Sequence, residues 1–120
     1  MKLNLDLKDE IEKYKDCVIL VEGKNDVGAL KGMGFEKVYA LHVIGVGLRE
    51  RVEQIVSEVG MKEPFCILMD LDKPGKKFYR LVKVVLQELG ARVDTKFRGL
   101  LTREKVSHLE GLGKFMDKLA

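Results

Sequence analysis

Blocks of apolar residues recur along the chain at spacings that predict strands alternating with helices. Two continuous apolar runs, Cys17–Val21 and Phe65–Met69, are typical of strands covered on both faces. Val38–Ile44 predicts another strand, and Val93–Phe97 a short fourth one. Apolar residues at helical spacing, together with cap and stop signals, predict helices near residues 6–15, 25–33, 48–59, 78–89 and from 102 onward.

Strands that alternate with helices imply right-handed βαβ crossovers and a parallel sheet between two helix layers. We therefore expect a three-layer α/β/α fold, and 120 residues are the length of a single domain. Asn25 and Thr102 are expected to cap two of the helices. In such a sheet the site lies beyond the carboxyl ends of the strands, where the strand order reverses. Chemistry is thus expected just after Val21, Ile44, Met69 or Phe97.

Composition narrows the class of protein. With 46% hydrophobic and 34% charged residues, the chain has the composition of an ordinary folded globule. Its apolar runs are too short for a membrane span, and nine charges in the first sixteen residues argue against a secretory signal. Cys17 and Cys66 share no local motif, so we expect reduced, buried thiols in a cytoplasmic protein.

Positive charge is concentrated in one segment of the chain. Residues 73–105 hold ten Lys or Arg against three acids, a net charge of +7, whereas the other residues sum to −4. This distribution suggests a side that faces a polyanion, although charge alone favours a solvated lysine-rich helix.

Carboxylates follow two of the predicted strands directly. Glu22 comes after the first strand, and Asp70 and Asp72 come after the third. Three carboxylates about 4 Å apart would repel by roughly 4 kcal/mol per pair at an effective dielectric of about 20, and only a cation or a raised pKa of a carboxyl group relieves this repulsion. All-oxygen ligation favours Mg²⁺ or Mn²⁺ over zinc. Acids at strand ends can also simply cap helices, but three of them at two strand ends favour a metal site.

The residues around these acids suit a phosphate ligand. Gly23 and Gly75 allow close backbone approach at the two turns. Lys76, Arg80 and Lys83 recur at helical spacing and would form a basic stripe opposite the apolar face of their helix. A basic stripe beside a cation site is what a nucleic-acid backbone requires.

The two motifs together resemble the Toprim domain. They are Glu22-Gly23 with Asp26 after the first strand, and Asp70-x-Asp72-x-x-Gly75 after the third. The resemblance covers residues 16–96, with a C-terminal helical extension over residues 97–120. It is greatest to small stand-alone Toprim proteins and to the Toprim ribonuclease that matures ribosomal RNA. It implies a sheet in the order 2-1-3-4.

The resemblance also implies roles for individual residues. Glu22 would be a general acid or base or a metal ligand, and Asp70 and Asp72 would hold magnesium. Lys24 and Asp26 would be supporting positions. Together with the turn glycines and the basic stripe, they make up the expected substrate-binding residues Gly23, Lys24, Asp26, Gly75, Lys76 and Arg80. Topoisomerases and many nucleases of the family have Gly-Glu where this chain has Gly75-Lys76, which leaves the number of metal ions open.

Other candidate motifs favour structural interpretations. Gly45-x-Gly47-x-x-Glu50 lacks the small third residue of a dinucleotide site, and neither Gly-Lys pair has the context of a P-loop. The tyrosines at 14, 39 and 79 are expected to be packing residues. His42, expected inside the second strand, and His108 have no metal-spaced partner and are expected to be structural or surface residues.

Two functional hypotheses follow, with a third held in reserve. The first is magnesium-dependent cleavage or transfer at a phosphodiester of RNA or DNA. The second is a nucleic-acid-binding module that is non-catalytic or needs a protein partner for substrate recognition. The third is a phosphatase of the haloacid-dehalogenase type with Asp70 as nucleophile, which would leave Glu22-Gly23 unexplained.

Overall fold

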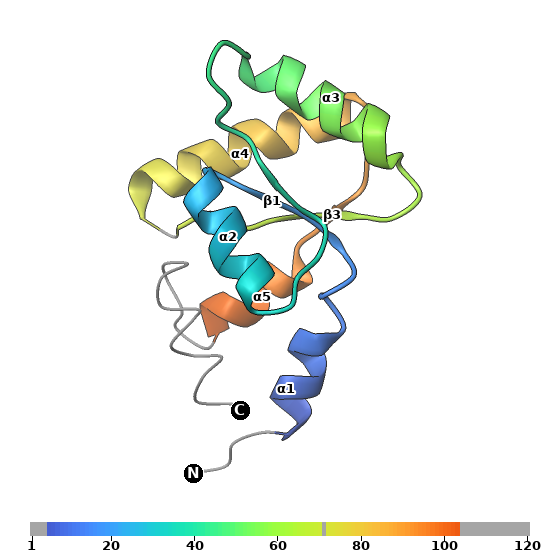
Figure 1. The fold of residues 1–120 in the computed structure, drawn as a ribbon, viewed down its shortest axis with the longest axis vertical. Coiled ribbons are helices and arrows are strands. Elements are labelled where there is room, and N and C mark those ends of the chain that lie inside the picture. Colours follow the sequence, from blue (N-terminus) through green and yellow to red (C-terminus); the bar gives the residue numbers. More distant parts are fainter. Residues whose placement is uncertain (1–4, 71, 104–120) are drawn as a thin grey trace.

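A four-stranded, all-parallel sheet lies between two layers of helices in the computed structural model, which describes residues 5–70 and 72–103 (Figure 1). The strand order is β2-β1-β3-β4, which confirms the predicted α/β architecture and its order. The strands are β1 (Val18–Val21), β2 (Val38–Ala40), β3 (Phe65–Ile67) and β4 (Val93–Asp94). The helices are α1 (Leu5–Glu12), α2 (Lys24–Gly32), α3 (Leu48–Val59), α4 (Lys73–Glu88) and α5 (Lys96–Arg103).

Strand β1 is buried at all four positions because its alternate side chains enter two different cores. Ile19 and Val21 pack with residues of α1, α2 and α5 on one face of the sheet. Val18 and Leu20 pack with residues of α3 and α4 on the other face. Figure 1 shows the same division, with α3 and α4 on one side of the strands and α2 and α5 on the other.

Several element boundaries differ from the sequence-based predictions. The prediction that β2 extends to Ile44 is wrong: this strand ends at Ala40, since β1, its only partner in the described chain, ends at Val21. The prediction of strand structure as far as Phe97 is also wrong. The Asp94 carboxylate accepts the Phe97 N–H at 3.1 Å, so the chain turns into α5 directly after β4.

Two predicted helix caps are also wrong. Gly23, not Asn25, is the residue that precedes α2, and the Asp26 carboxylate accepts the Gly23 N–H at 3.1 Å. Thr102 lies inside α5 and does not begin a helix. The predictions for His108 and for the extension beyond residue 103 lie outside the described residues.

Within residues 5–70 and 72–103, no helix is long and apolar enough to cross a membrane.

Candidate functional site at the carboxyl edge of the sheet

Glu22 and Asp70 leave the sheet at the same edge, from neighbouring strands. β1 and β3 are parallel partners in a register that pairs Leu20 with Ile67, and the Leu68 N–H donates to the Leu20 carbonyl at 2.9 Å. Glu22 follows β1 directly, and Asp70 lies three residues beyond the end of β3. This is also where the strand order reverses, because the chain goes from β1 to β2 on one side and returns to β3 on the other.

Glu22 is paired with a residue that the sequence did not single out for the site. Its Oε2 lies 3.5 Å from Nε2 of His42, and its carbonyl accepts the His42 N–H at 2.9 Å. The His42 ring stacks on Phe78 of α4, with centroids 4.8 Å apart and an interplanar angle of 14°. The expectation that His42 lies within the second strand is therefore wrong. The length of the predicted second strand could have indicated that His42 lies outside it, because a strand paired with the short β1 cannot continue to residue 44.

Asp70, Asp72 and Gly75 form a tight turn at the start of α4. The Asp72 side chain caps this helix by accepting the Gly75 N–H at 2.9 Å. A Cβ on Gly75 would lie inside van der Waals distance of the Asp70 carbonyl oxygen and 2.9 Å from Asp72 Oδ1. The expected close backbone approach at Gly75 is thus present. The segment that approaches Gly75 is the one that carries Asp70 and Asp72.

The carboxylates offer oxygen donors, but not a closed cage. Within the part of the chain that the structure describes, no three His, Cys, Asp or Glu side chains are grouped so that they could hold a metal ion. Mg²⁺ commonly takes one or two carboxylates and completes its shell with waters and substrate phosphates. The half-exposed Glu22, the half-buried Asp70 and the exposed Asp72 fit such a water-rich site. That all three share one ion stays a prediction.

Basic residues lie on α2 and α4, the helices that follow β1 and β3. Lys24 is the first residue of α2, and Lys76 and Arg80 are exposed on the first half of α4. Lys83 continues the same stripe and is half-buried. The apolar face of α4 points the other way, with Tyr79 and Val82 buried against the sheet. The charged face of α4 is therefore available to a ligand.

A pocket of about 290 Å³ opens where β2 ends and α2 begins. It is lined by Lys24, Ala40, His42, Val43 and Ile44. The pocket thus joins a cation of α2 to the imidazole that contacts Glu22 and to the apolar loop after β2.

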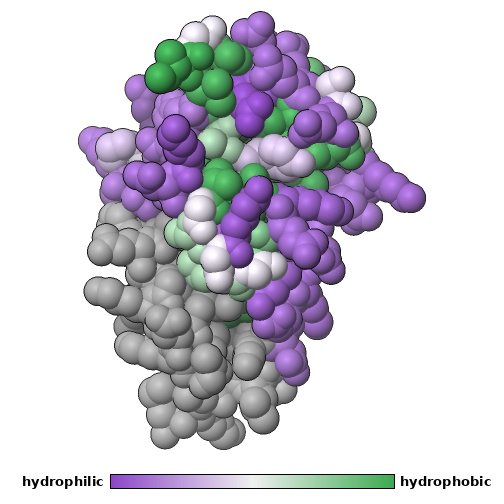
Figure 2. All heavy atoms as spheres, in the orientation of Figure 1, coloured by the Kyte–Doolittle hydropathy of each residue, from purple (hydrophilic) through white to green (hydrophobic). Residues whose placement is uncertain are grey.

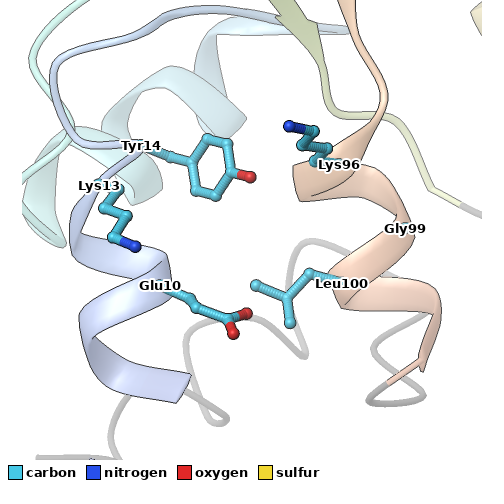
Figure 3. A pocket seen from close by; sticks show the side chains of 6 residues that line it. All are labelled: Glu10, Lys13, Tyr14, Lys96, Gly99 and Leu100. Carbon is cyan, nitrogen blue, oxygen red and sulfur yellow. The ribbon is translucent and has the colours of Figure 1, made fainter. Parts of the chain in front are cut away.

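A larger pocket of about 490 Å³ lies between α1 and α5 and contains no residue predicted for the site (Figure 3). Glu10, Lys13 and Tyr14 face Lys96, Gly99 and Leu100 across it. Although this pocket is larger, it is the weaker candidate site, because Glu22, Asp70 and the reversal of strand order are at the carboxyl edge of the sheet.

The tyrosines of the described chain serve packing, as predicted. Tyr14 stacks on Phe97 with ring centroids 4.5 Å apart, and Tyr39 packs against the core on the α3 and α4 side. Tyr79 is buried, and the Arg98 guanidinium lies 3.9 Å from the centre of its ring. Arg98, which follows β4, thus makes a cation–π contact from α5.

Both cysteines are free thiols, Cys66 buried and Cys17 only half-buried. Burial raises the pKa of the Cys66 thiol, and the nearby Asp94 carboxylate raises this pKa further. Partial burial also raises the pKa of Cys17. Because the thiolate is the reactive form, these raised pKa values disfavour the reactive state of both thiols at neutral pH.

Comparison with known proteins supports the fold. A solved structure of a protein from Aquifex aeolicus has 32% sequence identity and a TM-score of 0.72, and the match covers 92% of this chain and 99% of that one. A UPF0292 protein of Methanosarcina barkeri is 26% identical over 121 residues, which cover 95% of this chain and 80% of that protein. No family model matches the chain.

Proposed function

We propose that this chain is a Toprim-type enzyme that uses Mg²⁺ or Mn²⁺ to cleave or transfer a phosphodiester bond of RNA or DNA in the cytoplasm. The chain belongs to the same family as the Aquifex aeolicus protein. The observation that carries this proposal is the position of Glu22 and Asp70, which follow adjacent parallel strands at the strand-order reversal. Acidic residues at that position, with exposed cations on the following helices, suit a metal ion and a phosphate together.

Each residue has a chemical role in this proposal. Asp70 and Asp72 would hold the divalent ion, and the chemistry that the ion would supply is polarisation of the phosphoryl oxygens and a lowered pKa of a bound water. Glu22 accepts the proton that the attacking water loses as its oxygen bonds to phosphorus. The leaving oxygen takes up a proton from solvent water as its bond to phosphorus breaks. Lys24, Lys76 and Arg80 bind the neighbouring phosphates.

The experiment is a cleavage assay with the full chain on structured RNA, duplex DNA and single-stranded DNA, with and without Mg²⁺ or Mn²⁺. We expect metal-dependent products that Glu22→Gln and Asp70→Asn reduce by at least about 100-fold, the usual scale for removing an acid–base or metal-binding group. Glu36→Gln is the matched control, because Glu36 is exposed and precedes β2 at the opposite edge of the sheet. Full metal-dependent activity in both site variants would refute the proposal.

One observation favours a second candidate, a nucleic-acid-binding module that needs a partner protein for catalysis. The described residues contain no ready-made group of three metal-binding side chains, and one oxygen of Asp72 is already used as a helix cap. Metal-stimulated binding without any product, in the same assay, would favour this candidate. Release of phosphate from small monoesters would instead favour the phosphatase with Asp70 as nucleophile.

A further inference from the structure

The loop after β2 carries an apolar side chain at its tip. Val43 and Val46 form an isolated antiparallel bridge, and the Val46 N–H donates to the Val43 carbonyl at 3.1 Å. Gly45 supplies the positive φ of +82° that the third position of this tight turn requires. Ile44, in the second position, is fully exposed. Figure 2 shows an apolar patch at the top of the molecule, where Figure 1 has the loop between β2 and α3.

The pocket beside this turn combines an aromatic surface, an aliphatic edge and a cation. His42 lines it, and its side chain is 63% exposed although its ring stacks on Phe78. The stack holds the imidazole in one orientation and leaves part of it open to solvent. Ile44 and Val43 form the aliphatic edge, and Lys24 contributes the ammonium group.

We propose that this pocket binds one unpaired nucleotide of the substrate, directly beside the bond that reacts. The base would stack on the His42 ring with Ile44 at its edge, and its phosphate would pair with Lys24. The volume of about 290 Å³ is close to the lower limit of roughly 300 Å³ for small-ligand pockets, which suits one nucleotide. Because His42 contacts Glu22, a nucleotide here lies next to the acidic edge.

This inference rests on the proposed function and narrows its substrate class. A base inside a continuous duplex is stacked on both sides, so it cannot place a face on His42 without leaving the helix. The structure therefore favours loops, bulges and single strands over fully paired nucleic acid. Aromatic rings and aliphatic wedges are the groups that proteins use to hold unstacked bases.

The test is binding of the full chain, in EDTA, to two fluorescent probes. One carries 2-aminopurine in a hairpin loop, and the other carries it paired within a blunt duplex of the same length. We expect at least tenfold tighter binding to the unpaired probe, with quenching of its fluorescence by stacking. Ile44→Ser and His42→Ala should remove most of this preference. Met61→Ser is the matched control, because Met61 is an exposed apolar residue before β3, at the opposite edge of the sheet.

Each alternative outcome overturns this inference or supports it. Equal affinity for the two probes would overturn it, as would an unchanged preference in Ile44→Ser and His42→Ala. If Ile44→Ser converts a dimer to a monomer in light scattering but keeps the preference, the turn is a contact between copies and the inference is wrong. If the protein shows magnesium-dependent cleavage that Glu22→Gln abolishes but no preference for the unpaired probe, the proposed function holds and the nucleotide pocket is wrong. A preference without turnover would support the nucleotide pocket while the enzymatic function fails.

Discussion

Replacing Gly75 by alanine tests the packing of the turn that carries both aspartates. In an ordinary helix interior this substitution stabilises a protein by about 0.5–1 kcal/mol, because alanine loses less conformational freedom on folding. Here the new methyl group would overlap the Asp70 carbonyl oxygen and lie 2.9 Å from Asp72 Oδ1. The obstructing atoms include backbone, which cannot rotate away as the end of a flexible side chain would.

The expected net effect of Gly75→Ala is destabilisation. Overpacking of a tight site costs about 1–3 kcal/mol, and weakening the Asp72 cap costs about 1 kcal/mol more. After subtracting the propensity gain, we expect a loss of about 2 kcal/mol in the free energy of unfolding. For 120 residues that corresponds to a fall of about 8 °C in Tm.

Urea unfolding and calorimetry of Gly75→Ala beside Gly28→Ala measure this effect. Gly28 lies within α2, and nothing is within 4 Å of a Cβ built there. Gly28→Ala should therefore raise the free energy of unfolding by about 0.5–1 kcal/mol. The two variants should move in opposite directions. The reasoning is refuted if Gly75→Ala is as stable as the wild type, or if both variants shift in the same direction.

Three further predictions concern the pKa of a buried thiol, the Asp72 cap and the basic stripe. Since the pKa of Cys66 is raised in the folded state from 9.0, the stability that its protonated thiol contributes is complete below pH 9.0 and is lost as pH rises. Above pH 9 the free energy of unfolding of the wild type should therefore fall faster than that of Cys66→Ala, by up to about 1.4 kcal/mol per pH unit. Urea titrations at a series of pH values measure the two slopes, and equal slopes would contradict this prediction. Asp72→Asn keeps the cap oxygen and should change the free energy of unfolding by less than about 0.5 kcal/mol, whereas Asp72→Ala should lower it by about 1 kcal/mol. Both variants should lose metal-dependent activity. Replacing Lys76, Arg80 and Lys83 together by alanine should reduce the slope of log affinity against log salt by about 2–3, measured by fluorescence anisotropy, and an unchanged slope would mean that other residues hold the backbone.

The fold could be predicted because local patterns agree with the tertiary packing. The continuous apolar run of β1 requires cover on both faces, and its alternate residues do enter two cores. The boundaries were less predictable, because a single side-chain hydrogen bond decides them. The Asp94 carboxylate turns the chain into α5 where the apolar pattern alone continues the strand to Phe97.

The common edge at which Glu22 and Asp70 lie was also predictable, since residues that follow parallel strands leave the sheet at one edge. The contribution of His42 was not predictable in the same way. It depends on a stack with Phe78, which lies on a different element, 36 positions further along the chain. No local spacing encodes such a contact, and the ring positions follow only from how α4 crosses the sheet.

The strands at the two ends of the described sheet have only three residues in β2 and two in β4. An outer strand normally presents a row of unpaired N–H and carbonyl groups on which a foreign strand can grow. Here each row offers only two or three residues to a foreign strand, whereas the commonest strand length in folded proteins is about five or six residues. The short outer strands therefore protect both ends of the sheet from fibril-type growth.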